Sequence, residues 1–259
     1  MNPLLERIAR AYAPLGQLGR LMDGQYRFEP ELAPTTHQAT LEPRGKGMNT
    51  SRIVFHHGPH SRSTSTLMLL EELGAQYDMH VLNLAAGEQR QPAYLKVNPM
   101  GKVPAISHHG QLVTERPAVF TYLADLFPQA GLAPGLGDPL RGPYLRWLAF
   151  YGSCFEPAVM DNYMKNAVAP ATTCPYGDYE SVLGLVEAQL QGGPWLLGDR
   201  FTAADILWAN ALDYTMSFGL VARRPVFEAY VARLKVRPAI IRAAEQDEAL
   251  ARAQQRAAA

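Results

Sequence analysis

Short apolar stretches alternate with amphipathic segments between residues 52 and 127. Runs rich in β-branched and aromatic residues predict strands, and apolar positions three to four residues apart predict helices. In chain order the pattern predicts a strand over Arg52–His57, a helix over Ser63–Gly74, a strand over Tyr77–Leu82, a short helix over Pro92–Val97, strands over Val103–Ser107 and Gln111–Val113, and a helix over Pro117–Phe127. Gly110 marks a hairpin between the last two strands. This alternation implies parallel pairing in the first half of the sheet.

The second half of the chain carries helical patterns and no convincing strand. A Pro/Gly-rich linker over residues 128–139 precedes it. The predicted helices cover Leu140–Lys165, Tyr176–Gln191, Ala203–Phe218, Pro225–Val236 and Pro238–Ala253. The sequence therefore predicts an α/β N-terminal thioredoxin-like domain over residues 50–128, followed by an all-α C-terminal domain over residues 139–253.

A helix-start signal lies inside the helical half, at Phe201-Thr202-Ala203-Ala204-Asp205-Ile206. Thr202 is suited to be the N-cap, and Asp205 at the third helical position is suited to close a capping box. We interpret Asp205 as a folding residue, not a catalytic one.

The first 47 residues form a separate N-terminal extension. Apolar residues recur at helical spacing from Leu4 to Leu15 and predict a short amphipathic helix up to Pro14. The extension is interpreted as weakly ordered, or as a stretch upstream of a native start at Met48. An anchoring or docking helix is the alternative.

Bulk composition excludes several function classes. Lysine and arginine together number 24, as do aspartate and glutamate, so the absence of net charge does not indicate a nucleic-acid partner. No apolar run is long enough for a membrane span. Cys154 and Cys174 are too few for a disulfide framework and fit a reducing compartment, so a cytoplasmic location is expected.

Two neighbouring motifs carry the strongest chemical signal, Asn98–Ile106 and Val113–Val119. Pro104 cannot donate a ladder hydrogen bond and holds Val103 extended, which leaves backbone polar groups free for a peptide-like ligand. Glu115 and Arg116 fall directly before a predicted helix, whose N-terminus favours an anion. Together the motifs predict a site for a small zwitterionic peptide.

These motifs, with Phe55–Ser63 and Leu69–Gly74, resemble those of the soluble (cytosolic) glutathione transferases of the bacterial type, without the cysteine-type catalytic residue. The likeness runs from about Ser51 to about Glu248. It implies a cis-proline at Pro104, with the Val103 backbone holding the cysteinyl part of glutathione. It also implies that Glu115 holds the γ-glutamyl end. Lys102 and Arg116 are expected to help Val103 and Glu115 hold the peptide. Arg116 stands where the family usually has serine, and a larger guanidinium is expected to reorganise the pocket while still able to hold a carboxylate.

The family resemblance implies a thiolate-stabilising residue between the first strand and the first helix. No Tyr occurs between Tyr26 and Tyr77, and no Cys precedes Cys154, so a cysteine-type site with disulfide-exchange chemistry is not expected. Ser61 is the first candidate, with an N-cap role as its alternative. Ser63 and His57 are second candidates, and Arg62 is interpreted as a solvated or structural cation.

No metal site is assigned. His56, His57 and His60 lie close together in the sequence, but no carboxylate or thiol accompanies them at the spacing of a zinc site.

The sequence is thus interpreted as a glutathione transferase that conjugates the glutathione thiolate to a small hydrophobic electrophile in detoxification. Aromatic residues after the linker, Trp147, Phe150, Tyr151 and Phe155, with Met160, suit a flat apolar electrophile, although most are expected to be packing residues. Alternatives are a glutathione-dependent lyase or dehalogenase, and a non-catalytic binding scaffold. The resemblance implies a homodimer, with neither nucleic acid nor membrane as partner.

Overall fold

The computed structural model of the chain describes residues 52–258. The helix expected near residues 4–15 lies outside the described residues. Among residues 52–258, none of the helices combines the length and the apolar composition that a bilayer span requires.

A four-stranded sheet forms the centre of the first half, with strand order β2-β1-β3-β4. Its strands are β1 (Ile53–His57), β2 (Tyr77–Val81), β3 (Ala105–His108) and β4 (Gln111–Val113). β1 pairs with β2 in parallel, whereas β3 is antiparallel to both β1 and β4. The predicted strand order along the chain, the parallel first pair and the hairpin at Gly110 are therefore confirmed.

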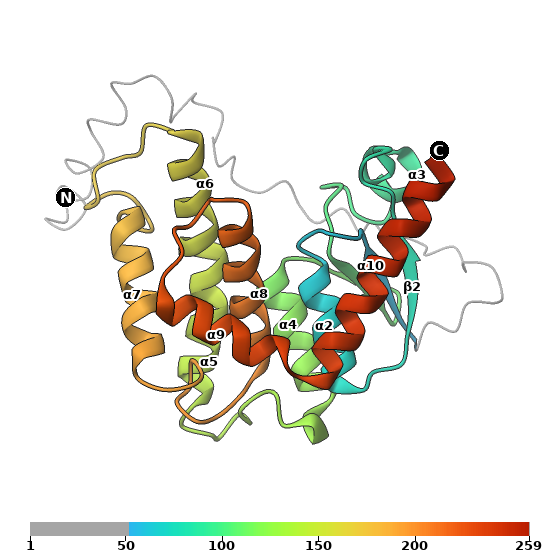
Figure 1. Cartoon of the computed structure of the whole chain (residues 1–259). Helices are drawn as coiled ribbons and strands as arrows, with labels where there is room; N and C mark the ends of the chain where they lie inside the picture. The colour runs from blue at the N-terminus through green and yellow to red at the C-terminus, as the bar shows by residue number, and fades with distance from the viewer. Residues whose placement is uncertain (1–51, 259) are drawn as a thin grey trace, which may run out of the picture. The chain divides into compact units, whose positions relative to one another are not determined.

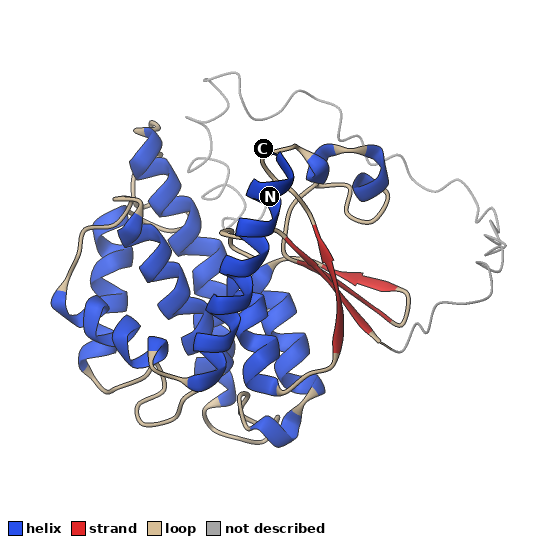
Figure 2. Cartoon of the chain, turned by 45° about the vertical axis from the view of Figure 1, so that its right-hand side comes forward, coloured by secondary structure: helices blue, strands red, loops and turns tan. Residues whose placement is uncertain are grey.

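The two faces of the sheet are covered differently (Figures 1 and 2). Helices α2 (Thr64–Leu73) and α4 (Arg116–Leu126) pack against one face and against the helical half. Phe55 of β1 and Leu67 of α2 are fully buried in the core that results. On the other face, His56 packs against Tyr94 of the short helix α3 (Pro92–Leu95), which follows the 3₁₀ turn η1 (Glu88–Arg90).

Within the described residues, the second half is built of helices, apart from two isolated β-bridges, Trp195–Gly198 and Leu197–Arg200. The linker contains one 3₁₀ turn, η2 (Pro128–Ala130). The helices that follow are α5 (Arg141–Phe150), α6 (Glu156–Met164), α7 (Tyr179–Gln191), α8 (Ala203–Ser217), α9 (Pro225–Lys235) and α10 (Pro238–Ala258). The single helix predicted over Leu140–Lys165 is interrupted by a π-helical turn, η3 (Tyr151–Phe155). Such turns occur frequently at functional sites.

Helix α8 is the central helix of the helical half. The capping box predicted for it is formed, and the Asp205 carboxylate accepts the backbone N–H of Thr202 at 2.8 Å. Asp205 also accepts hydrogen bonds from the backbone N–H of Leu196 at 2.8 Å and from the hydroxyl of Tyr230 at 2.9 Å. These contacts bind the start of α8 to its neighbours and match the structural role predicted for Asp205.

The long helix α10 returns to the α/β half and packs along α2 (Figure 1). Arg237, directly before α10, pairs with Glu72 of α2 at 2.6 Å. This return brings Asp247 of α10 to the loop between β1 and α2. The end of the chain thus contributes to the predicted site region, which the linear motifs do not reveal.

Candidate functional site

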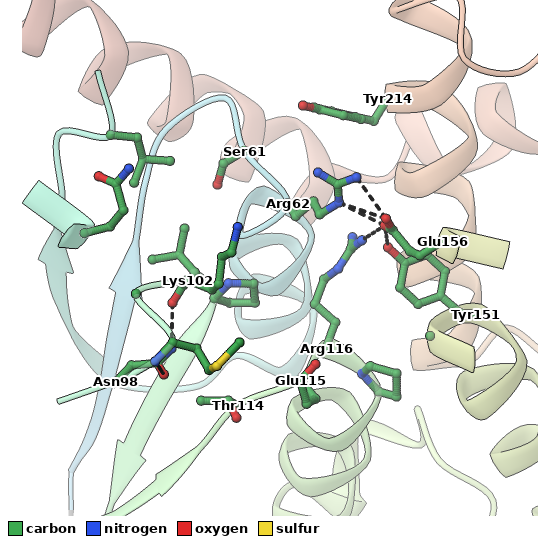
Figure 3. Close-up of a pocket in the computed structure, with 18 of the residues that line it drawn as sticks. Ser61, Arg62, Asn98, Lys102, Thr114, Glu115, Arg116, Tyr151, Glu156 and Tyr214 are labelled. Carbon is green, nitrogen blue, oxygen red and sulfur yellow. Dashed lines mark hydrogen bonds and ion pairs between the residues drawn. The ribbon is translucent and has the colours of Figure 1, made fainter. Parts of the chain in front are cut away.

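A cavity of about 740 Å³ lies where the loops at one end of the sheet face the helical half (Figure 3). Six of the predicted site residues line it: Ser61, Lys102, Val103, Pro104, Glu115 and Arg116. The other two, Ser63 and His57, are fully buried beneath its wall and do not line it. The α/β half and the helical half both contribute residues to this cavity.

One wall is the loop that leads into β3. The Val103–Pro104 peptide bond is cis, as the family resemblance implied. Tyr94 donates its hydroxyl to the Lys102 carbonyl at 2.8 Å, and Asn98 donates its side-chain amide to the same carbonyl at 2.9 Å. These two bonds position the loop directly before Val103.

Two charged side chains line the cavity without any protein partner in the described part of the chain. Lys102 and Glu115 are both exposed, and no ion pair or hydrogen bond involves either side chain. Glu115 has a backbone φ of 61° and ψ of 114°, outside the ordinary regions for a residue with a side chain. Strain of this kind persists where surrounding structure fixes the residue, frequently at ligand sites.

Arg116 is held by the helical half. Its side chain is only 7% exposed and pairs with Glu156, which opens α6. The guanidinium also lies over the Tyr151 ring, with its central carbon 4.4 Å from the ring centroid. Burial lowers the pKa of Arg116 to about 10, against the opposing effect of Glu156. The reorganisation expected for a guanidinium in the place of serine is therefore an ion pair that joins α4 to α6.

Glu156 also binds a second guanidinium. Arg62 donates to the two carboxylate oxygens of Glu156, from Nε and Nη2, each at 2.9 Å. These hydrogen bonds raise the pKa of Arg62, although burial opposes the rise. Tyr151 donates its hydroxyl to the same carboxylate (Figure 3). Arg62 is structural as interpreted, but it also lines the cavity.

The cavity wall carries a surplus of positive charge. Its cationic side chains are Arg62, Arg90, Lys102 and Arg116, against the carboxylates Glu115 and Glu156. A tripeptide with two carboxylates and one ammonium group has net negative charge at pH 7, and it gains a second negative charge when its thiol ionises. The surplus therefore favours such a ligand, and favours the thiolate over the thiol.

The loop from β1 to α2 places Ser61 at the cavity. The helix N-cap is Ser63, not Ser61, and Ser63 makes no side-chain capping bond. Ser61 Oγ lies 2.8 Å from Ser63 Oγ and accepts the backbone N–H of Ser63 at 3.1 Å. Ser61 and Lys102 direct their polar ends toward the same part of the cavity (Figure 3).

Behind Ser61 the contacts continue into the protein. Ser63 Oγ lies 2.8 Å from His57 Nδ1, and His57 Nε2 lies 2.9 Å from Asp247 Oδ1. Ser63 and His57, which do not line the cavity, are thus connected to Ser61, which does.

Of the aromatic residues considered for the second substrate, Tyr151 lines the cavity, together with Met160. Trp147 and Phe155 are buried in the core, and Phe150 packs against Trp208, which agrees with the expectation that most are packing residues. Tyr214 of α8 lines the cavity but was not predicted. The motif analysis also missed Glu156, because its role depends on the π-helical turn before it.

Two family models match the chain. "Glutathione S-transferase, N-terminal domain" matches residues 51–125, and "Glutathione S-transferase, C-terminal domain" matches residues 177–238. They cover the α/β half and the stretch from α7 to α9 of the helical half respectively.

Similar proteins come from plants and bacteria. "Glutathione S-transferase PARB" of Nicotiana tabacum is 28% identical over 75% of this chain and 98% of its own length. "Disulfide-bond oxidoreductase YfcG" of Escherichia coli is 27% identical over 72% of this chain and 92% of its own.

Solved structures with the same fold include a glutathione transferase from Methylococcus capsulatus, with a TM-score of 0.64 and 29% identity. It covers 76% of this chain, and 98% of its own length is matched. A sphingomonad glutathione S-transferase complexed with glutathione has a TM-score of 0.63 and 29% identity, over 75% of this chain and 98% of its own.

Proposed function

Because the chain belongs to the glutathione transferase family, we propose that it binds glutathione as co-substrate in this cavity and transfers the glutathione sulfur to a small apolar electrophile. The observation that carries the proposal is the composition of one cavity wall. An exposed carboxylate, an exposed ammonium group, the backbone beside a cis-proline and a serine hydroxyl all face the same space. The sphingomonad structure with bound glutathione supports the choice of peptide.

Each part of the peptide has a complementary group in the cavity. The backbone N–H and C=O of Val103 pair with the cysteinyl part, and the unpartnered Glu115 carboxylate receives the γ-glutamyl ammonium group. Lys102 attracts a glutathione carboxylate. Arg116 contributes charge from behind the wall, because its guanidinium is already bonded to Glu156.

Ser61 is the group proposed to stabilise the thiolate. A free thiol with a pKa of about 8.5 is only ~3% ionised at pH 7, and lowering that pKa by ~2 units takes about 2.7 kcal/mol. One hydrogen bond to a charged acceptor contributes about 1.5–3 kcal/mol. The positive surplus of the wall adds to this, so the requirement is within reach of the groups present.

A glutathione titration followed by thiolate absorbance tests the proposal. At pH 7 the absorbance should rise with saturation, whereas S-methylglutathione should bind without any rise. Binding with no thiolate signal would favour the non-catalytic scaffold, and absence of binding would refute the assignment of the cavity.

A second candidate reaction is glutathione-dependent disulfide reduction, favoured by the similarity to the Escherichia coli disulfide-bond oxidoreductase. The same bound thiolate would attack a disulfide sulfur instead of a carbon, and a second glutathione would release the mixed disulfide. Neither Cys154 nor Cys174 lines the cavity. Assays with an aryl halide and with a small disulfide, run side by side, separate the two reactions, and product analysis separates conjugation from lyase or dehalogenase chemistry.

A homodimer is also proposed. A groove of about 610 Å³ lies between α4 and α5 and includes Tyr122, Leu145 and Leu148. Leu145 is 38% exposed there, although large apolar side chains are ordinarily covered. Sedimentation of the full chain should therefore give twice the monomer mass, and Leu145→Glu should reduce it to the monomer mass.

A further inference from the structure

The row of polar groups behind Ser61 runs from the cavity to a buried carboxylate. In order, Ser61 Oγ, Ser63 Oγ, His57 and Asp247 lie 2.8, 2.8 and 2.9 Å from one another. Ser63 and His57 are fully buried, and Asp247 is 4% exposed. We infer that this row is a proton relay, which takes the proton of the glutathione thiol from the cavity to His57. The inference rests on the proposed function, because it concerns how the same bound thiol ionises.

The hydrogen-bond directions follow from Asp247. Burial disfavours its charge, but the close approach and electrostatic attraction of His57, with hydrogen bonds from the His60 backbone N–H and Thr64, outweigh burial and hold the pKa of Asp247 below its usual range. His57 Nε2 lies 2.9 Å from Asp247 Oδ1, without the alignment of a hydrogen bond in this conformation. Because an ionised carboxylate only accepts, we place the His57 proton on this nitrogen. In neutral His57, Nδ1 is then the acceptor. Ser63 therefore donates to Nδ1, and Ser61 donates to Ser63.

Other contacts of Ser63 are compatible with this direction. Its hydroxyl oxygen accepts the backbone N–H of Gly58 at 3.0 Å, which uses one lone pair and leaves the other for Ser61. The Gly58 carbonyl, at 3.0 Å, competes with His57 for the Ser63 hydrogen, but the Nδ1 contact is shorter at 2.8 Å. Ser61 Oγ also accepts the Ser63 backbone N–H, which fixes its position.

In the resting state, the Ser61 hydrogen points toward Ser63 and away from the cavity. The Ser61 hydroxyl stabilises a thiolate only when its hydrogen points into the cavity, and the proton relay produces that reorientation. The thiol S–H bond breaks and its proton goes to Ser61 Oγ, the Ser61 proton goes to Ser63 Oγ, and the Ser63 proton goes to His57 Nδ1. The electron pair stays on sulfur, His57 becomes an imidazolium beside Asp247, and Ser61 now donates to the thiolate.

The surroundings of His57 favour this acceptor. Asp247 of α10 faces its ring. The next residue of α10, Glu248, pairs with His60 at the surface, with Oε2 2.9 Å from His60 Nε2. The backbone carbonyl of His57 is occupied by the N–H of Leu82 at 2.7 Å, and the Phe55 ring packs at 5.2 Å. A buried imidazolium thus finds one ionised partner at contact distance, which stabilises its charge. In this scheme Ser63, His57 and Asp247 are positioning residues that act through Ser61.

The wild-type protein provides the main test, so no variant needs to fold. At pH 7.5, histidine nitrogen NMR should show His57 neutral in the free protein, imidazolium with glutathione, and neutral with S-methylglutathione. Calorimetry in buffers of different ionisation enthalpy should show almost no proton released on glutathione binding. If the proton instead leaves for solvent, roughly 0.8 of a proton per glutathione is expected for a bound thiol pKa of about 6.5.

Two variants interrupt the relay at different points. Ser63→Ala removes the middle hydroxyl, and Asp247→Asn removes the charge but keeps a hydrogen-bond acceptor. Each should leave His57 neutral in the glutathione complex, raise the bound thiol pKa by about 1–2 units and lower turnover at pH 7 about tenfold or more, with recovery at higher pH. Ser65→Ala is the matched control. It removes a buried hydroxyl from the same helix that donates to the Arg62 carbonyl outside the row, and it should leave all three readouts unchanged.

The outcomes separate this inference from the proposed function. A thiolate signal with a neutral His57 and a released proton would refute the relay but leave the transferase proposal intact. The same holds if His57 is already an imidazolium in the free protein, because both ring nitrogens are then protonated and cannot accept the thiol proton. Absence of any thiolate signal would refute the proposed function itself.

Discussion

Replacing Glu156 with glutamine should destabilise the folded protein far more than the loss of an ordinary surface charge. Glu156 is the shared partner of Arg62 and Arg116, and Arg116 is only 7% exposed. Breaking a buried ion pair from one side costs about 3–5 kcal/mol, because an uncompensated charge stays buried. Glu156 is itself 23% exposed and glutamine still accepts hydrogen bonds, so we expect about 3 kcal/mol. Arg116→Met should cost less, about 1–2 kcal/mol, because Glu156 keeps Arg62 and Tyr151.

The free energy of unfolding of the double variant, Glu156→Gln with Arg116→Met, tests this reasoning most directly. With both charges removed, no buried guanidinium is left without a partner, since the remaining one, Arg62, is 37% exposed. The loss in the double variant should therefore be about 2 kcal/mol smaller than the sum of the single losses. Urea unfolding of the ligand-free protein, followed by tryptophan fluorescence and circular dichroism, measures all three variants. Glu228→Gln in the exposed pair with Arg223 is the control and should change stability by less than about 0.5 kcal/mol. Additivity of the two single losses within about 0.5 kcal/mol would refute the reasoning, because coupled charges cannot behave independently.

Three further predictions concern binding, pH and the N-terminal extension. Glu115→Ala should weaken glutathione binding by about 1.5–3 kcal/mol in calorimetry, and an unchanged Kd would remove Glu115 from the site. Burial, to which the neighbouring His80 adds, lowers the pKa of His56 to about 4. As the pH falls from 6.5 to 4, the unfolded state therefore gains a proton at His56 and the folded state does not. Up to about 3 kcal/mol of folding stability should be lost over this window. His56→Gln should flatten that slope in urea unfolding at several pH values, and an equal slope would contradict the assignment. Deleting residues 1–47 should leave folding and glutathione binding intact, since the family match begins at residue 51, and loss of folded protein would show that the extension packs on the body.

The elements were predictable from the sequence because their signals are local. Strand alternation, the Thr202–Asp205 box and the prolines that open α4 and α9 each act within a few residues of their own position. The observed ends differ from the predicted ones by a few residues, which is the ordinary uncertainty of helix and strand termini. The interruption over Tyr151–Phe155 was missed although local signals exist. Gly152 lies within it, and Pro157 two residues after it lacks the N–H that a regular helix would bond to the Ser153 carbonyl.

The same distinction between local and long-range signals applies to the residues of the candidate site. Val103, Pro104 and Glu115 belong to two neighbouring motifs of the chain, so they were predicted together, and all three line the cavity. Glu156 and Asp247 reach the site only because α6 and α10 fold back onto the first half, about 40 and 190 residues after the residues they contact. No local sequence pattern predicts a contact over such separations. The residue type alone does not distinguish Glu156 and Asp247 from acidic residues at the surface.

The position of Arg116 explains why the departure from the family pattern requires a residue from the other half of the chain. A guanidinium at the start of α4 is directed into the contact between the two halves, where burial lowers its pKa to about 10 although Glu156 opposes the shift. Such a charge is tolerated only with a carboxylate beside it, and α6 provides Glu156 directly after the π-helical turn. The same carboxylate binds Arg62 from the loop that carries Ser61. In the proposed function, the residues that face glutathione and the helical residues that face the electrophile are therefore connected through one carboxylate. A change at Glu156 should then alter both the affinity for glutathione and the choice of electrophile, whereas a serine at position 116 would leave the two halves of the cavity connected only through Arg62.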